Sequence, residues 1–585
     1  MAYSDVAIDL SSPSASQEGF LAMSPTMDEL DYGDAQSRGM SRSGSGLTGL
    51  MRRNETDKTL LWAAENAEAD DYLHDPNPEL DKYLDKQMQH WSLAGLINTL
   101  SLAAIVIVLV GLFGGWPIYN YAINGGFPDG ASQYANQIDS SGTVPNMALP
   151  TLVDPTTPNF AKTRTGFDGQ DYELVFSDEF NTSGRTFWAG DDPYWEAVDL
   201  HYWATTDLEW YDPDAIITKD GYLQITMSEQ ANHDLNFRSG MLQSWNKFCF
   251  TGGYIEFGAI LPGTVHSQGF WSALWTMGNL GRPGYGGSVD GMWPYSYDTC
   301  DVGTLPNQTY PNGTAPALAK SSGSTDYGGE LSYLVGQRAS ACTCSADSGE
   351  HPGPSVGVGR GAPEIDVLEA QISYPSSGAI GAASQSTQVA PFDAAYTWGN
   401  STPNTLMYNE NITFQNNWHG SISQESMSVY TYTDTTSYVD GGATQTTYGM
   451  EYHPGGGTDA NITWAVNGTE TWSMLAAAMG PNEGTEIGQR LVSEEPMAII
   501  MNLALSTKAQ EPLYQYLTFP ATFKVDYVRV YQQKGKYNVG CNPKAFPTTD
   551  YINNHLDLYM NNNLTTFAQS NYTTPRNSMG ATGCN

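Results

Sequence analysis

The chain has 585 residues, of which 63 are acidic and 25 are basic, giving a formal net charge of −38 at pH 7. This length exceeds that of one ordinary domain and leaves ample material for a large core. A surface so negative argues against nucleic acids and anionic polymers as partners, because their charges would be repelled. A neutral polymer meets no such barrier.

The N-terminal region differs from the rest in composition. Residues 1–90 are dominated by Ser, Gly, Asp and Glu and lack an apolar period, which is typical of a disordered tail. An uncharged run of 21 residues, 93–113, follows. As a helix it would measure about 31 Å and could cross a lipid bilayer. It starts too far into the chain for a signal peptide. We therefore predict a transmembrane helix over 91–116. The nearby lysines, Lys82 and Lys86, lie on its N-terminal side alone, which predicts a cytoplasmic N-terminus.

Two further features agree with this type II, single-pass topology, in which the C-terminal part is lumenal or extracellular. All six cysteines follow the apolar run, an even number that suits disulfides in an oxidising compartment of the secretory pathway, from the endoplasmic reticulum and Golgi to the plasma membrane. Nine glycosylation sequons also follow it, and only Asn54 precedes it. The cysteines are Cys249, Cys300, Cys342, Cys344, Cys541 and Cys584. The sequon asparagines are Asn181, Asn307, Asn312, Asn400, Asn411, Asn461, Asn467, Asn563 and Asn571.

The C-terminal part divides into three segments. Residues 117–165 are rich in Pro, Asn, Ser and Thr and are predicted to form a lumenal stalk. Over 166–533, short runs of Tyr, Trp, Val and Thr alternate with Gly, Pro, Asn and Asp turns, which predicts an all-β sandwich. Residues 534–585 carry a cysteine near each end and predict a disulfide-tied extension. Clear examples of the predicted strands are Tyr172–Ser177, Tyr222–Met227, Gly253–Gly258 and Val525–Tyr531.

The stretch Pro363–Ala370 places three carboxylates within six residues, among apolar neighbours. On a strand, Glu364 and Asp366 point to the same face, and one β-bulge near Leu368 would bring Glu369 to that face as well. Paired carboxylates about 5–5.5 Å apart are what a retaining glycosidase uses as nucleophile and acid/base. The alternatives for this motif alone are a solvated acidic strand edge or a calcium site.

Seven blocks, in this order along 166–533, resemble glycoside hydrolase family 16, the laminarinase-like enzymes with a concanavalin-like β-jelly-roll. The blocks are Leu174–Phe180, Ser239–Ser244, Gly253–Gly258, Gly269–Gly278, Tyr448–Tyr452, Met501–Ala504 and Val525–Tyr531.

The chain is more closely similar to the fungal membrane proteins associated with cell-wall β-glucan synthesis. That subgroup shares the tail, the single span, the family-16 domain and a long insert, here 279–362. The resemblance implies a role in making or tailoring β-1,6-linked or branched β-glucan. It also implies β-glucan chains or oligosaccharides as substrates, a lipid bilayer contacted through 93–113, and other wall-synthesis proteins as candidate partners.

The resemblance also implies roles for the three acids. Glu364 would be the nucleophile and Glu369 the general acid/base. Asp366 would orient the nucleophile, and its charge would raise the proton affinity of whichever glutamate must stay protonated.

Three further residues are candidates for substrate binding. Trp271 and Trp275 share one strand face, where indole rings suit the C–H-rich faces of sugars; core packing is the alternative. Gln371 follows Glu369 onto the same face and could hydrogen-bond a sugar hydroxyl. The family commonly has a His before the Tyr448–Tyr452 block, whereas this chain has Thr there.

Other constellations give no cofactor and no metal site. The pair Cys342 and Cys344 lacks partners at zinc spacing, and the histidines are scattered. We expect Cys541–Cys584 to close the extension and Cys300 to bond to Cys342 or Cys344.

Two functions remain open from sequence. One is a membrane-anchored β-glucan glycosidase or transglycosylase with a retaining mechanism. The other is a non-catalytic glucan-binding scaffold of the wall-synthesis machinery.

Overall fold

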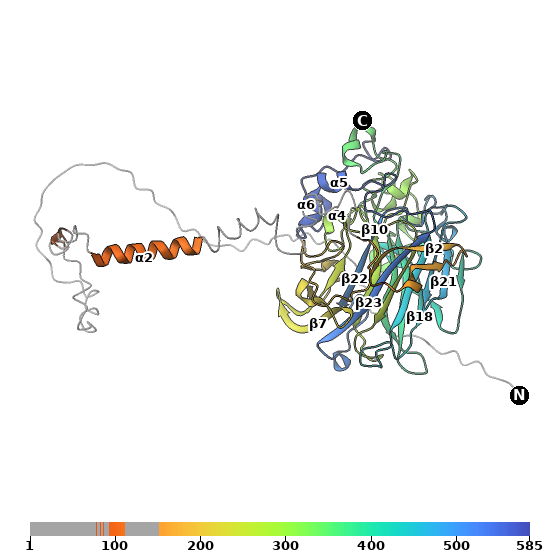
Figure 1. The fold of residues 1–585 in the computed structure, drawn as a ribbon. Coiled ribbons are helices and arrows are strands. Elements are labelled where there is room, and N and C mark those ends of the chain that lie inside the picture. Colours follow the sequence, from red (N-terminus) through yellow and green to blue (C-terminus); the bar gives the residue numbers. More distant parts are fainter. Residues whose placement is uncertain (1–77, 79–81, 84–85, 87–92, 111–150) are drawn as a thin grey trace, which may run out of the picture. The chain divides into compact units, whose positions relative to one another are not determined.

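The computed structural model describes residues 78, 82–83, 86, 93–110 and 151–585 (Figure 1). Most of the predicted tail and stalk therefore lies outside the described residues. Helix α2 (Leu93–Val110) and the domain formed by 151–585 belong to separate compact units.

The part of the chain that the structure describes contains no helix with both the length and the apolarity needed to span a bilayer. Helix α2 covers residues 93–110 of the predicted span. The predicted transmembrane helix over 91–116 is therefore not borne out. Positions 91–92 and 111–116 of this predicted helix lie outside the described residues.

The domain is built from two stacked, almost wholly antiparallel β-sheets, as the all-β prediction required (Figure 1). The outer sheet has thirteen strands and the site sheet has ten. The outer strands are β1 (Thr163–Thr165), β2 (Asp171–Asp178), β4 (Leu200–His201), β5 (Glu209–Tyr211), β6 (Ile216–Lys219), β7 (Tyr222–Asn232), β8 (Leu235–Ser239), β11 (Gly253–Ile260), β15 (Thr405–Met407), β19 (Thr446–His453), β20 (Asn461–Val466), β21 (Thr469–Leu475) and β23 (Ala521–Gln533). The site-sheet strands are β3 (Glu196–Ala197), β9 (Met241–Gln243), β10 (Cys249–Phe250), β12 (Phe270–Gly278), β13 (Glu364–Ser373), β14 (Ile380–Val389), β16 (Thr413–Gln415), β17 (Gly420–Ser421), β18 (Gln424–Tyr432) and β22 (Met497–Leu505).

Strand order places the acidic stretch near the middle of the site sheet, which runs β16-β18-β14-β13-β12-β22-β9-β3. The helices of the domain are all short. The α-helices of the domain are α4 (Gly286–Val289), α5 (Thr549–Asn554) and α6 (Leu556–Met560). The 3₁₀ helices are η3 (Asn159–Lys162), η4 (Trp203–Thr205), η5 (Pro213–Ala215), η6 (Val302–Thr304), η7 (Pro306–Gln308), η8 (Leu318–Lys320), η9 (Thr325–Tyr327), η10 (Ser345–Glu350), η11 (Ala394–Tyr396), η12 (Ala476–Met479), η13 (Tyr514–Tyr516) and η14 (Phe567–Gln569).

The main core lies between the sheets because side chains alternate faces along each strand. On β12, Leu274 packs into this core, whereas Trp275 and Met277 lie in a second apolar cluster on the opposite face. The two sheets also meet through a polar contact: the Nε1–H of Trp464 on β20 donates to the backbone oxygen of Asp366 at 2.8 Å. Strand β13 is therefore held rigidly from behind.

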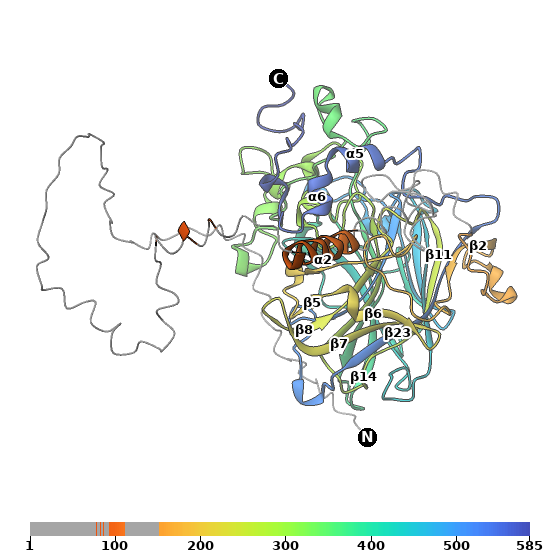
Figure 2. The ribbon, with the colours of Figure 1, turned by 60° about the vertical axis from the view of Figure 1, so that its left-hand side comes forward.

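The C-terminal extension forms a cap on the site sheet. Helices α5 and α6 contribute Tyr551, Leu558 and Tyr559 to the second apolar cluster, where they pack with Ile500 of β22 and residues of the insert (Figure 2). Ring stacking between Tyr559 and Trp245, with centroids 5.5 Å apart, reinforces the contact. The extension is thus part of the domain rather than an appendage.

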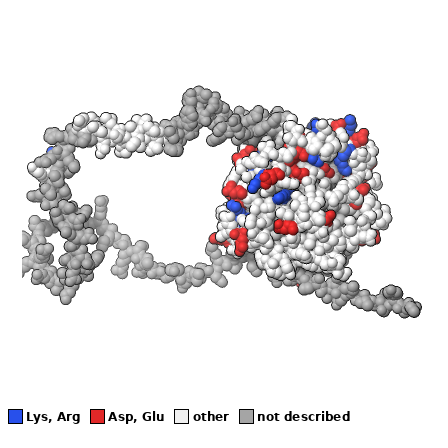
Figure 3. Space-filling model, turned by 60° about the horizontal axis from the view of Figure 1, so that its bottom comes forward, with Lys and Arg blue, Asp and Glu red and all other residues white. Residues whose placement is uncertain are grey.

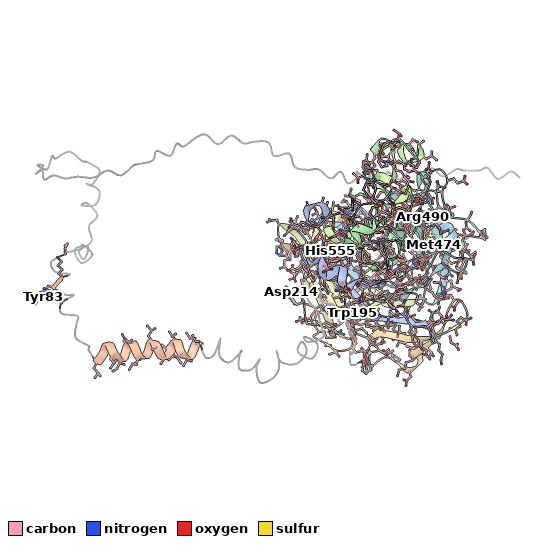
Figure 4. All side chains as sticks on the ribbon, turned by 90° about the horizontal axis from the view of Figure 1, so that it is seen from above. Tyr83, Trp195, Asp214, Met474, Arg490 and His555 are labelled. Carbon is pink, nitrogen blue, oxygen red and sulfur yellow. A yellow bond between two sulfur atoms is a disulfide. The ribbon has the colours of Figure 1, made fainter. Side chains whose placement is uncertain are left out.

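The insert is a folded lobe whose Tyr, Val and Leu side chains form a small core together with Ala390, Phe392 and Ile487. Beside this lobe, the fully buried Arg490, labelled in Figure 4, pairs with Asp393 and with Glu425. In the cap, His555 lies 2.9 Å from a carboxylate oxygen of Glu350, so insert and extension are joined by a polar contact as well.

Three disulfides link the domain: Cys249–Cys541, Cys300–Cys342 and Cys344–Cys584. The Cys300–Cys342 alternative is confirmed, but the expected Cys541–Cys584 bond is wrong. The reason is that the extension does not fold on itself: one of its cysteines faces β10 and the other faces the insert.

The start of the domain also differs from the prediction, which began it at residue 166. Val153 forms a bridge with Ser177, and the Asp154 side chain accepts the Glu179 N–H at 3.1 Å. Residues 151–165 of the predicted stalk therefore belong to the sandwich.

Candidate active site

A β-bulge in β13 brings the three acids to one face, as the sequence predicted. In the register with β14, Asp366 pairs with Ser386 and Glu369 with Ser384, so the spacing shifts between them. Val367 and Leu368 are consequently both buried in the main core. Without this extra residue, Glu369 would point inward.

Serine and glutamine side chains on β14 hold the acids in place. The Ser386 hydroxyl lies 2.8 Å from Asp366 Oδ2 and 3.3 Å from Glu369 Oε2, so it bridges the two carboxyls. The Gln388 amide donates to Asp366 Oδ2 at 3.1 Å. Asp366 is almost completely buried and is thus held by two neighbouring side chains.

Two indoles bond to the outer pair of acids. Trp271 on β12 donates to Glu369 Oε1 at 3.2 Å. Trp293, from the insert, donates to Glu364 Oε2 at 2.7 Å. Each indole N–H can only donate, so each favours a carboxyl oxygen that accepts.

Burial raises the pKa of all three acids, and charge repulsion raises it further for the two glutamates. Burial raises the pKa of Asp366 to about 6. Burial and then the charge of Asp366 raise the pKa of Glu369 to about 8. Burial, followed by the charges of Asp366 and Glu369, places the pKa of Glu364 well above its usual range, against the effect of the Trp293 bond. At neutral pH the group therefore retains protons that isolated carboxyls would have lost.

The tryptophans predicted to face the substrate occupy different environments. Trp271 is half-buried beside Glu369. Trp275 is only 8% exposed, and its Nε1–H donates to Asn502 Oδ1 at 2.8 Å. The cleft exposure expected for Trp275 is therefore wrong: its ring lies in the second apolar cluster, and it forms part of the floor of the site.

Gln371 lies on the face of Glu369, as alternation predicted. Its side chain hydrogen-bonds Tyr430 of β18, a phenol whose pKa is raised to about 12 by burial and then by the charge of Glu369. Tyr202 lies on the other side of the acids, where burial and then the charge of Glu364 raise its pKa.

Six of these residues were not identified from sequence: Trp293, Ser386, Gln388, Tyr202, Tyr430 and Asn502. Ser386 and Gln388 alternate along one strand, a signal that could have marked them as facing the acids. Trp293 comes from the insert, about 70 residues before Glu364, and no local pattern indicates its contact.

The other predicted sites are distributed over the domain. All six cysteines form disulfides, so none of them is a metal ligand. Among the described residues one carboxylate–histidine group, Asp168, Glu451 and His453, has ligand atoms within 4.8 Å of one another. Glu451 already accepts the backbone N–H groups of Phe167 and Asp168, so we assign no metal there. Each of the nine sequon asparagines is exposed or half-buried.

Comparison with known proteins gives the family. The family model described as "Beta-glucan synthesis-associated protein SKN1/KRE6/Sbg1" matches residues 60–584. The chain belongs to this family. It is 42% identical over 519 residues to the beta-glucan synthesis-associated protein KRE6 of Saccharomyces cerevisiae, a match that covers 85% of this chain and 66% of that protein.

A second member of the family and a solved structure are also similar to this chain. The SKN1 protein of Candida albicans is 41% identical over 85% of this chain and 64% of its own length. This SKN1/KRE6/Sbg1 family member thus spans somewhat less than two thirds of these relatives. The catalytic domain of an endo-1,3-beta-glucanase (laminarinase) from Thermotoga petrophila is similar at 17% identity and a TM-score of 0.36, over 63% of this chain and all of that one.

Proposed function

We propose that the domain is a retaining β-glucan glycosidase or transglycosylase that acts in fungal cell-wall β-glucan formation, with β-1,6-linked chains as its main target. The observation that carries this proposal is the bulge in β13, which sets Glu364, Asp366 and Glu369 on one face between two indole donors. The family's printed role in β-glucan synthesis supports the substrate class. The three disulfides fit a secretory or extracellular compartment.

In the first step, a carboxylate oxygen of Glu364 attacks the anomeric carbon, and the bond to the leaving sugar oxygen breaks. Glu369 gives its proton to that oxygen, and a covalent glycosyl ester remains on Glu364. A pKa of about 8 keeps Glu369 protonated at neutral pH, which suits this role. The Trp293 bond favours the ionised form of Glu364.

In the second step, Glu369 takes a proton from water or from a sugar hydroxyl, whose oxygen attacks the same carbon and releases Glu364. Water gives hydrolysis, and a sugar gives transfer. Asp366 stays buried beside both and orients Glu369 through Ser386.

The test uses the full chain with defined β-1,3- and β-1,6-gluco-oligosaccharides, and identifies the products by mass. Glu364→Gln should lower product formation by several orders of magnitude, because the nucleophile is lost. Glu410→Gln, an exposed carboxyl outside the site, is the matched control and should keep wild-type rates. Wild-type glucan assembly in cells carrying Glu364→Gln would contradict the enzymatic proposal and favour the scaffold.

A further inference from the structure

A group of exposed tyrosines lies at the end of the domain away from the cap. Tyr514 and Tyr516, both in η13, are 51% and 53% exposed, and Tyr374, just after β13, is 53% exposed. Figures 1 and 2 show the loop that carries η13 beside the β7–β8 hairpin and opposite α5 and α6. None of these phenol rings contributes to a core cluster.

Tyr514 lines a hollow of about 560 Å³ between η13 and the hairpin. Its lining offers one carboxylate, one amide and two aromatic rings, and no basic side chain: Glu229, Ala231, Asn236, Phe237 and Tyr514. Tyr514 is backed by Phe237, whose ring is nearly parallel to it at 6.3 Å, so its orientation is fixed from behind. The surface therefore combines flat apolar rings with hydrogen-bonding groups at the rim.

The loop that carries the tyrosines is fastened to the catalytic strand. The Gln510 side chain accepts the N–H of Ile372 at 3.1 Å and donates to its carbonyl at 2.6 Å. Gln268 donates to the Glu511 carbonyl at 2.8 Å. Gly269 permits the approach, since a Cβ there would lie 2.9 Å from the Cα of Pro512. The loop that carries the tyrosines is thus held in a fixed position relative to β13.

The distance from Glu369 to the tyrosines and the charge of the hollow's lining indicate what these tyrosines would bind. Tyr374 lies five residues beyond Glu369, which is about 17 Å along an extended strand and within reach of one polymer chain. The pKa of Tyr374 is raised by burial and then by the phenol of Tyr516, so the two side chains lie near each other. The carboxylate in the lining disfavours anionic chains, as does the net charge of the whole chain. On the face in Figure 3, charged side chains are scattered over a larger uncharged area.

We propose that Tyr374, Tyr514 and Tyr516 form a second carbohydrate-binding platform that holds a neutral β-glucan chain whose other part lies at the acids. Sugar rings stack their C–H faces on the phenols, and Glu229 and Asn236 bond hydroxyls in the hollow. This proposal rests on the proposed function for the identity of the polymer. It adds that the protein grips long chains more tightly than short ones.

The test measures binding without turnover, using the full chain carrying Glu364→Gln. Its mobility is recorded in native gels that contain a soluble β-1,3-glucan or β-1,6-glucan polymer, and binding of a gluco-disaccharide is measured by calorimetry. Adding Tyr514→Ala and Tyr516→Ala should weaken polymer binding by about tenfold, the effect of losing two stacking contacts, and leave disaccharide binding unchanged. Tyr408→Ala, a similarly exposed tyrosine on the far edge of the outer sheet, is the matched control and should bind as the parent does.

These binding measurements test the tyrosine platform alone. The proposed enzymatic function is tested separately, by product formation. Unchanged polymer binding in the double variant would overturn the platform even if the acids are catalytic. An equal loss for polymer and disaccharide would also overturn it, because the tyrosines would then act at the acids or on the fold. Tyr374→Ala, at an exposed position outside any strand, gives a second measurement should the double variant melt at a lower temperature.

Discussion

Replacing Trp293 by Phe tests whether the insert takes part in the chemistry. The substitution removes one N–H donor and keeps a smaller aromatic ring in its place. The lost bond is 2.7 Å long and ends on Glu364, so it joins a neutral donor to a charged acceptor when the nucleophile is ionised. Such bonds contribute about 1.5–3 kcal/mol, so at a pH where Glu364 must lose a proton to react, losing this one lowers kcat/KM by up to about 10- to 150-fold.

The same substitution should change the pH profile. The Trp293 bond lowers the pKa of Glu364, against burial and two neighbouring charges that raise it. Without the bond this pKa rises further, so a larger fraction of the nucleophile is protonated at a given pH. The acidic limb of kcat/KM against pH should therefore move to higher pH.

The assay compares kcat/KM across pH for the wild type and two tryptophan variants on one β-gluco-oligosaccharide. Trp188→Phe is the control, because Trp188 also donates its N–H to a carboxylate, that of Asp214 at 3.0 Å, but at an exposed position outside the site. Its profile should match the wild type. An unchanged acidic limb in Trp293→Phe, with the fold intact, would refute the idea that the insert tunes the nucleophile.

Three further outcomes are expected. Glu369→Gln should strongly slow the turnover of substrates with poor leaving groups. It should slow aryl glycosides with good leaving groups much less, because these leaving groups need little protonation. Equal slowing of both substrate types would exclude Glu369 as the acid. The pKa of Glu369 is about 8 in the folded state and about 4.3 in an unfolded chain. The folded state therefore binds this proton more tightly, and the contribution of Glu369 to stability is lost as pH rises from about 4 to 8. Denaturant unfolding of Glu369→Gln should therefore depend less on pH over that window, and an unchanged slope would contradict the assignment. Replacing Cys344 and Cys584 by Ser should loosen the cap and lower the free energy of unfolding. The loss should lie near the lower end of the roughly 2–5 kcal/mol that is typical of a removed disulfide, because Cys249–Cys541 remains. Limited proteolysis should then cut first within 534–585, and an unchanged cleavage pattern would contradict this.

Local patterns in the sequence predicted the parts of the site that local geometry controls. Period-two alternation and the one-residue excess between Asp366 and Glu369 were enough to infer the bulge, and the register with β14 bears this out. The strands predicted from Tyr, Val and Thr runs are present as β2, β7, β11 and β23. These features depend on neighbours a few residues apart.

Contacts between distant segments could not be obtained in this way. The burial of Trp275 depends on covering residues from the insert and from the extension. The pairing of Cys344 with Cys584 spans 240 residues. Both depend on how separate segments pack in three dimensions, which no periodicity in one chain records.

The long separation between Cys344 and Cys584 also affects when the protein can mature. The insert reaches its last covalent tie only after another 240 residues have been synthesised, which takes about 10–50 s at ordinary elongation rates. Until then the lobe that brings Trp293 to Glu364 lacks this tie. The last covalent closure of the insert therefore follows synthesis of the C-terminal residues and requires oxidation of both thiols.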